Sequence, residues 1–182
     1  MSSRKLYVFG DICPEMAEQF IYDLHDLSRS KPEEEIEINI CTEGGCVYSM
    51  FAMHDAMRSV TCPIRTFGIG QVMSAGVLLL SAGDYRLIYP HTCVMIHEPI
   101  SESMELGSTS LRQQIEYFEK QKNQMFKLYA EYSGQDLKKI ESDLYKEDGL
   151  YLTAEEALKY GFVDEICELR KRKVKRKSSR KR

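Results

Sequence analysis

Residues 68–83 form a glycine-rich, apolar run with Ser74 near its middle, and this run constrains the fold more than any other stretch. The β-branched and aromatic residues at 64–70 predict a short strand that closes on glycines. Residues 75–82 predict a buried helix. Ser74 is therefore expected at a strand-to-helix turn.

A serine at such a turn is suited to acyl transfer. Its Oγ can point into a cleft, and the amide of the next residue lies at a helix N-terminus, where unpaired N–H groups stabilise developing negative charge. The alternative is that Ser74 only caps the start of its own helix, a frequent role of serine. The turn alone does not separate these interpretations.

Two further strand ends carry groups that would complete an acyl-transfer site. A strand over residues 36–40 is followed by Gly44-Gly45, a pair that lets the backbone approach a ligand and aim a free N–H at it. A strand over residues 86–95 delivers His97, and imidazole is the usual proton acceptor for a serine. Three consecutive strand ends thus supply a nucleophile, a base and backbone donors.

Three segments resemble motifs of the proteolytic subunit family of the Clp protease, ClpP, whose members are self-compartmentalised serine peptidases. Residues 70–76, Gly-Gln-Val-Met-Ser-Ala-Gly, are similar to the family's Gly-Gln-x-x-Ser-Met-Gly. Residues 95–99, Met-Ile-His-Glu-Pro, are similar to its Met-Ile-His-Gln-Pro. Residues 152–164, which begin Leu-Thr-Ala-Glu-Glu-Ala, resemble the segment after the family's catalytic aspartate. The resemblance extends over residues 5–168.

The resemblance implies a serine endopeptidase with Ser74 as the nucleophile and His97 as the general base. It also implies that the amides of Gly45 and Ala75 form the oxyanion hole. Ala75 stands where the family usually has methionine, and this departure leaves the chemistry intact because a backbone N–H does the work. No metal and no organic cofactor is implied.

The third catalytic residue is left open by the sequence. The family places its aspartate two residues before an aromatic residue, which Tyr151 marks here, yet Gly149 occupies that position. The loop is also longer than the family pattern. Three alternatives are open: the acid is Asp148, the acid is Glu147, or the site has no acid. In the first case Gly149 would supply the permissive backbone conformation that brings Asp148 to His97. A Ser–His pair without its acid still reacts, only more slowly.

Strands and helices alternate along the chain and predict an α/β fold with a partly parallel sheet. The expected strands cover 4–10, 36–40, 64–67 and 86–95, and the expected helices cover 14–28, 47–58, 75–82, 111–132 and 137–145. The family resemblance adds a crotonase-like arrangement of stacked ββα units. The helix over 111–132 has only a narrow apolar stripe, which predicts a handle projecting toward another subunit. In the family such handles join two rings, so a homo-oligomer of one or two rings, heptameric by analogy, is implied.

The length of 182 residues suits one domain with its own core, which we place at residues 1–169. The six cysteines form no Cys-x-x-Cys pair, so we expect reduced core thiols rather than a zinc site or disulfides. Cys46 is a weak rival nucleophile, because no histidine other than His97 is assigned to it. The chain shows no apolar run of membrane-spanning length and no basic-then-apolar leader, so a cytoplasmic protein is expected.

Residues 170–182 hold ten of the 25 Lys and Arg residues and none of the 28 acidic residues, so the rest of the chain is strongly acidic. Such a tail fits either a disordered, solvated segment or a contact with an acidic surface or nucleic acid. No aromatic residue interleaves the basic ones, so base recognition is not indicated.

Three functions are consistent with the sequence. The first is an ATP-dependent, Clp-type endopeptidase that cleaves short or unfolded peptides inside an oligomeric chamber. Its coupling to a Clp ATPase is left open, because only residues 1–3 precede the first expected strand. The second is a catalytically silent ring subunit, for which Gly149 is the motivating residue. The third is a crotonase-type acyl-CoA enzyme, which a separation of Ser74 from His97 beyond hydrogen-bond reach would favour.

Overall fold

The computed structural model of the protein describes residues 4–100, 108–146 and 149–170. The strands are β1 (Lys5–Phe9), β2 (Ile36–Thr42), β3 (Ile64–Met73), β4 (Tyr85–Ile88), β5 (Cys93–Ile96), β6 (Leu150–Leu152) and β7 (Glu165–Ile166). The helices are α1 (Pro14–Ser30), α2 (Val47–Ser59), α3 (Ala75–Ser81), α4 (Ser108–Ser133), α5 (Leu137–Leu144) and α6 (Ala154–Tyr160). The predicted alternation of strands and helices is confirmed, and the main differences lie in β3 and in the region of β4 and β5.

Most of the strands run parallel in one sheet. Their order is β1-β2-β3-β4-β7, with β5 beside the end of β3 and β6 antiparallel to β5. Apolar residues alternate inward along β2, where Ile36, Ile38 and Ile40 are fully buried. Because parallel strands end at the same edge of a sheet, the segments that follow β2, β3 and β5 are brought together there.

Strand β3 is longer than the sequence predicts and divides between two partners. It pairs with β4 from Arg65 to Gly68 and with β5 from Gln71 to Met73. Between these stretches its register against β2 shifts, and Gly70 takes a φ of 67° there. Such a bulge bends the strand. The strand therefore passes through its glycines and ends at the residue before Ser74.

The prediction of a single strand over residues 86–95 is wrong, because a turn separates β4 from β5. Pro90 has no amide to contribute to a sheet ladder. The amide of Thr92 donates to the carbonyl of Tyr89 at 3.0 Å, and its Oγ1 donates to the carbonyl of Gly68 at 3.1 Å. This turn carries the chain from β4, which pairs with the first part of β3, to β5, which pairs with its last residues. His97 therefore lies beside Ser74.

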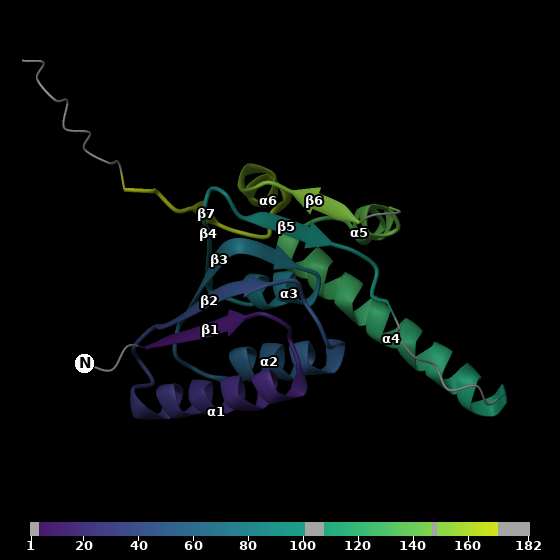
Figure 1. The fold of residues 1–182 in the computed structure, drawn as a ribbon, viewed down its shortest axis with the longest axis horizontal. Coiled ribbons are helices and arrows are strands. Elements are labelled where there is room, and N and C mark those ends of the chain that lie inside the picture. The colour runs from purple at the N-terminus through teal and green to yellow at the C-terminus, as the bar shows by residue number, and fades with distance from the viewer. Residues whose placement is uncertain (1–3, 101–107, 147–148, 171–182) are drawn as a thin grey trace, which may run out of the picture.

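The helices pack against the sheet, and part of α4 projects beyond it (Figure 1). In Figure 1, α1 and α2 lie beneath the sheet, and the N-terminal part of α4 extends away from the body at the lower right. Every residue of α3 is buried. Met125, Phe126 and Tyr129, in the C-terminal half of α4, are at most 1% exposed, whereas Ile115 is 44% exposed. Only the N-terminal part of α4 therefore projects, which corrects the expectation for the whole predicted helix.

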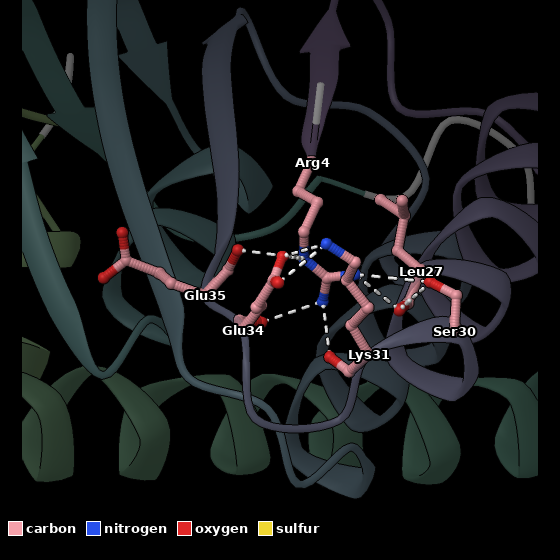
Figure 2. Close-up of polar contacts among 6 residues, drawn as sticks. All are labelled: Arg4, Leu27, Ser30, Lys31, Glu34 and Glu35. Carbon is pink, nitrogen blue, oxygen red and sulfur yellow. Dashed lines mark hydrogen bonds and ion pairs between the residues drawn. The ribbon is translucent and has the colours of Figure 1, made fainter. Parts of the chain in front are cut away.

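Arg4 joins the start of β1 to the end of α1 and to the turn before β2 (Figure 2). Its guanidinium donates to four backbone carbonyls, those of Leu27 and Glu34 at 2.8 Å, Lys31 at 3.0 Å and Glu35 at 3.2 Å. Carbonyls at a helix C-terminus lack intrahelical donors, and a cation there also complements the helix dipole. Arg4 thus fixes the first connection between parallel strands.

None of the helices within the described ranges is long and apolar enough to cross a membrane. Apart from Arg170, the predicted basic tail at residues 170–182 lies outside the described residues.

Candidate active site

Ser74 lies between β3 and α3, as the sequence predicts. Its φ of 51° and ψ of −122° are unusual, and no other non-glycine residue in the described part of the chain has a positive φ. Its amide donates to the carbonyl of Met95 in β5 at 2.7 Å, which pins the turn to the neighbouring strand. The side chain makes no capping hydrogen bond to α3. A strained strand-to-helix turn of this kind presents Oγ at the edge of a sheet.

His97 follows β5, and its Nε2 lies 2.8 Å from Ser74 Oγ. Burial lowers the pKa of His97 below its ordinary value of 6.5, and a hydrogen bond to the Glu98 backbone opposes this shift without cancelling it. The neutral imidazole is the form that can accept a proton from a hydroxyl. The pair therefore has the contact and the protonation state of a serine activated by a base.

The backbone of the glycine pair lies directly against Ser74. A Cβ on Gly44 would come within 2.8 Å of Ser74 Cβ and 3.3 Å of its Oγ, so this approach requires glycine. Gly45 is held by a parallel bridge to Ile12. Within the described ranges, neither the amide of Gly45 nor that of Ala75 donates to a protein acceptor. These two N–H groups are thus free to bind a developing oxyanion.

The candidate acids Asp148 and Glu147 lie outside the described residues. Gly149, which follows them, has a φ of 75°, as its predicted permissive role requires. A Cβ on Gly149 would lie 3.0 Å from His97 Cβ and 2.7 Å from the carbonyl oxygen of Ile96. The chain directly after the two candidate acids therefore packs against His97.

Asp143 anchors the start of this loop. Its carboxylate accepts hydrogen bonds from Lys139, Lys146 and Tyr160 at 2.6, 2.7 and 2.8 Å. Burial acts to raise the pKa of Asp143, but these hydrogen bonds outweigh it and bring the pKa down to about 2. The carbonyl of Lys146 then accepts from the Gly149 amide at 3.0 Å, which links the anchor to the segment beside the base.

Tyr129 supports the serine turn, and sequence reasoning missed it. Its side chain is fully buried, and its hydroxyl donates to the carbonyl of Ser74 at 3.0 Å. Burial raises the pKa of Tyr129, so the hydroxyl stays a donor over the whole working range of pH. Its position four residues after Met125, on the buried face of the helix, is the signal that could have found it.

Cys46 has different surroundings. Burial acts to raise the pKa of its thiol, but hydrogen bonds from Ser49 and from the Tyr48 backbone outweigh it and lower the pKa. Its partners therefore belong to α2, and no histidine is among them. All six cysteines lie in the described ranges and are free thiols. The same ranges contain no group of three side chains that could hold a metal ion.

The comparison with known proteins identifies the family. The family model described as Clp protease matches residues 1–170. The chain belongs to the Clp protease family. It is 31% identical over 168 residues to the ATP-dependent Clp protease proteolytic subunit 2 of Mycolicibacterium paratuberculosis. The matched region covers 91% of this chain and 83% of that protein. The identity to subunit 1 of Mycobacterium bovis and to that of Mycobacterium tuberculosis is also 31%, over 82% of each.

Membership of the Clp protease family confirms the predicted resemblance and the predicted α/β fold. It makes the chain a ClpP-type peptidase, a hydrolase that acts in proteolysis. Clp proteases in general form ring oligomers and work with Clp ATPases.

Proposed function

We propose that this Clp protease is a serine endopeptidase that cleaves short or unfolded peptides inside an oligomeric chamber. The observation that carries the proposal is the 2.8 Å contact between Ser74 Oγ and His97 Nε2. Ser74 Oγ attacks the peptide carbonyl while His97 takes its proton, and the amides of Gly45 and Ala75 bind the oxyanion. His97 then protonates the leaving amine, and water releases the acyl group from Ser74.

We assign Asp148 as the acid that orients His97. The support is the position of Gly149, whose backbone packs against the His97 side chain and the Ile96 carbonyl. The chain therefore passes His97 at the residue directly after Asp148. The role of Asp148 would be to fix the tautomer of His97 and to stabilise the imidazolium.

Family membership supports a proposal for the assembly and its partners. We propose a homo-oligomer of one or two rings, heptameric by analogy, in which a Clp ATPase unfolds folded substrates and delivers them to the chamber. The basic segment at residues 170–182 would contact an acidic surface or nucleic acid. Six free thiols fit the reducing cytoplasmic compartment that we propose for the protein.

Labelling of the purified, assembled protein with a fluorophosphonate tests the mechanism. Mass spectrometry of the digest should place the adduct on Ser74, and Ser74→Ala should remove it. His97→Ala should slow labelling by at least about a hundredfold, whereas His91→Ala, at an exposed histidine, should leave the rate unchanged.

Two outcomes would overturn the peptidase. A folded, assembled protein whose Ser74 stays unlabelled would be the silent ring subunit. Turnover of acyl-CoA thioesters that persists in Ser74→Ala would favour the crotonase-type enzyme. The hydrogen-bond contact between Ser74 and His97 speaks against that enzyme class, which does not need it.

A further inference from the structure

Lys122 of α4 is a buried cation close to the site. Only 7% of the residue is exposed, and lysine is rarely buried without partners. Its Nζ lies 3.3 Å from Glu98 Oε1 and 2.7 Å from Glu119 Oε2, and it stands 5.7 Å from the centre of the Tyr145 ring. Burial acts to lower the pKa of Lys122, but the two carboxylates outweigh it and raise the pKa. Lys122 is therefore a permanent, fixed positive charge.

The partners of Lys122 come from the two segments that flank the base. Glu98 directly follows His97, at the position where the family motif has glutamine. Tyr145 directly follows α5 and packs edge-on against Phe126 of α4, with ring centres 5.9 Å apart. The chain beyond Tyr145 reaches Gly149, whose backbone lies against His97. One ammonium group thus contacts both the segment that holds the base and the start of the loop beside it.

We propose that Lys122 is a positioning residue of the peptidase site, which fixes the His97 segment and the loop after α5 on helix α4 through Glu98 and Tyr145. The inference rests on the proposed function, because it concerns the base that activates Ser74. It also explains why this chain carries a carboxylate at position 98, since Lys122 supplies the matching charge.

The charge balance gives the proposal a specific signature. An unpaired carboxylate next to an imidazole favours the protonated ring, which cannot act as a base. Lys122 pairs with Glu98, and its loss would leave that carboxylate unpaired one residue from His97. The elements packed around the His97 segment contribute these further titratable groups: Cys46, Glu119, Tyr129, Asp143, Tyr145, Lys146 and Tyr151.

The experiment is the rate of fluorophosphonate labelling of Ser74 against pH, on the full-length assembled protein. Lys122→Met should slow labelling by roughly 10- to 100-fold, because a small displacement of a base is enough to cost that much. It should also move the midpoint of the pH profile upward, because Glu98 is left unpaired. Glu98→Gln combined with Lys122→Met should return the midpoint to the wild-type value while the rate stays low. Lys122→Arg, which keeps the charge, should restore most of the rate.

The controls separate positioning from general damage. Lys127→Met, at an exposed lysine of the same helix, should match the wild type. A Lys122→Met protein with the wild-type rate and midpoint would overturn the proposal. So would a slow Lys122→Met whose midpoint is unchanged and which Lys122→Arg does not rescue, because that pattern belongs to a merely structural residue.

Two further outcomes are decisive. If Lys122→Met does not fold, Glu98→Gln alone carries the test, because Glu98 is partly exposed and Lys122 keeps Glu119 as a partner. It should slow labelling without raising the midpoint, and a wild-type rate would overturn the proposal. A wild-type protein that is never labelled would overturn the proposed function itself, whereas failure confined to the variants overturns only the role of Lys122.

Discussion

Ser74 keeps a backbone conformation that costs an L-residue roughly 1–3 kcal/mol. Two contacts hold it there, the bond from its amide to the Met95 carbonyl and the bond from the Tyr129 hydroxyl to its own carbonyl. Neither contact involves the Ser74 side chain. The strain should therefore persist in any variant that keeps a Cβ at this position. Because the strained conformation also presents the hydroxyl, activity and stability compete at this residue.

Ser74→Gly should be more stable than Ser74→Ala by about 1 kcal/mol, because both lose the hydroxyl and only glycine relieves the strained φ. Urea unfolding of the two purified variants measures the difference. The pair Ser28→Gly and Ser28→Ala, inside helix α1, is the matched control and should show the opposite order, since glycine is unfavourable in a helix. Equal stability of the two Ser74 variants would show that no strain is stored at this Cβ.

The pH dependence of labelling depends on His97. Because burial lowers the pKa of His97, the midpoint of the rate profile should lie below 6.5. As pH falls through that midpoint, His97 gains a proton and labelling slows. The unfolded chain then binds protons that the folded chain does not, so folding stability also decreases as pH falls below 6.5. His97→Gln should remove this pH dependence, and a wild-type midpoint above 6.5 would contradict the effect of burial.

At the scale of whole elements, the sequence pattern predicted helices α1 to α5 and strands β1 to β3, but not β6, α6 or β7. Local signals for helix starts are nevertheless present in all three of the following cases. Pro14 stands in the first turn of α1, Asp136 caps α5, and Thr153 and Glu156 form a capping box at the start of α6. These signals need only neighbouring residues. The length of β3 and the separation of β4 from β5 depend on which strands pair, and that is not a local property. Glycines that looked like a strand end proved to be a bulge, and Pro90, which the prediction placed inside a strand, proved to lie in a turn.

The residues of the site also fall into those that local sequence predicts and those whose roles depend on tertiary packing. Ser74, His97 and the glycine pair could be proposed because each follows a strand, and Ser74 and His97 also match family motifs. Tyr129 and Lys122 could not, because their roles depend on how the C-terminal half of α4 packs against α3 and the loop after α5. A helix that looked polar in sequence thus supplies two supports of the site. The acid remains a prediction, since Asp148 and Glu147 lie outside the described residues.

Arg4 provides a test of how the first elements are joined. Arg4→Met should lower the free energy of unfolding by about 2 kcal/mol, because several carbonyls lose a charged donor. Arg4→Lys should recover only part of the loss, since an ammonium cannot reproduce the planar fork. Arg29→Met, which removes an exposed ion pair with Asp26 in the last turn of α1, should change the free energy of unfolding by less than about 0.5 kcal/mol. Comparable losses from Arg4→Met and Arg29→Met in denaturant unfolding would contradict the anchoring role.

At the scale of the whole molecule, the projecting part of α4 exposes apolar surface. Ile115 and Tyr117 are 44% and 52% exposed, and Tyr117 stacks on Tyr48 of α2, itself 59% exposed, with ring centres 6.3 Å apart. Figure 1 shows this part of α4 extending beyond the sheet and the other helices. Exposed aromatic and aliphatic residues on a projecting element are typical of subunit contacts. In a ring-forming family, this surface is the one we expect a second copy of the chain to cover.

Ile115→Asp should weaken assembly, because an interface that covers this position would have to bury an unpaired carboxylate. The loss should reach at least roughly tenfold in the association constant. Sedimentation velocity over a range of protein concentrations measures it, and Gln113→Asp, at an exposed position of the same helix, is the matched control. Unchanged assembly of Ile115→Asp would place the subunit contact elsewhere. Tyr129 and Lys122 lie in the packed half of the same helix. The rate of Ser74 labelling in the dissociated Ile115→Asp protein therefore shows whether contact of α4 with another subunit is needed to hold His97 in place.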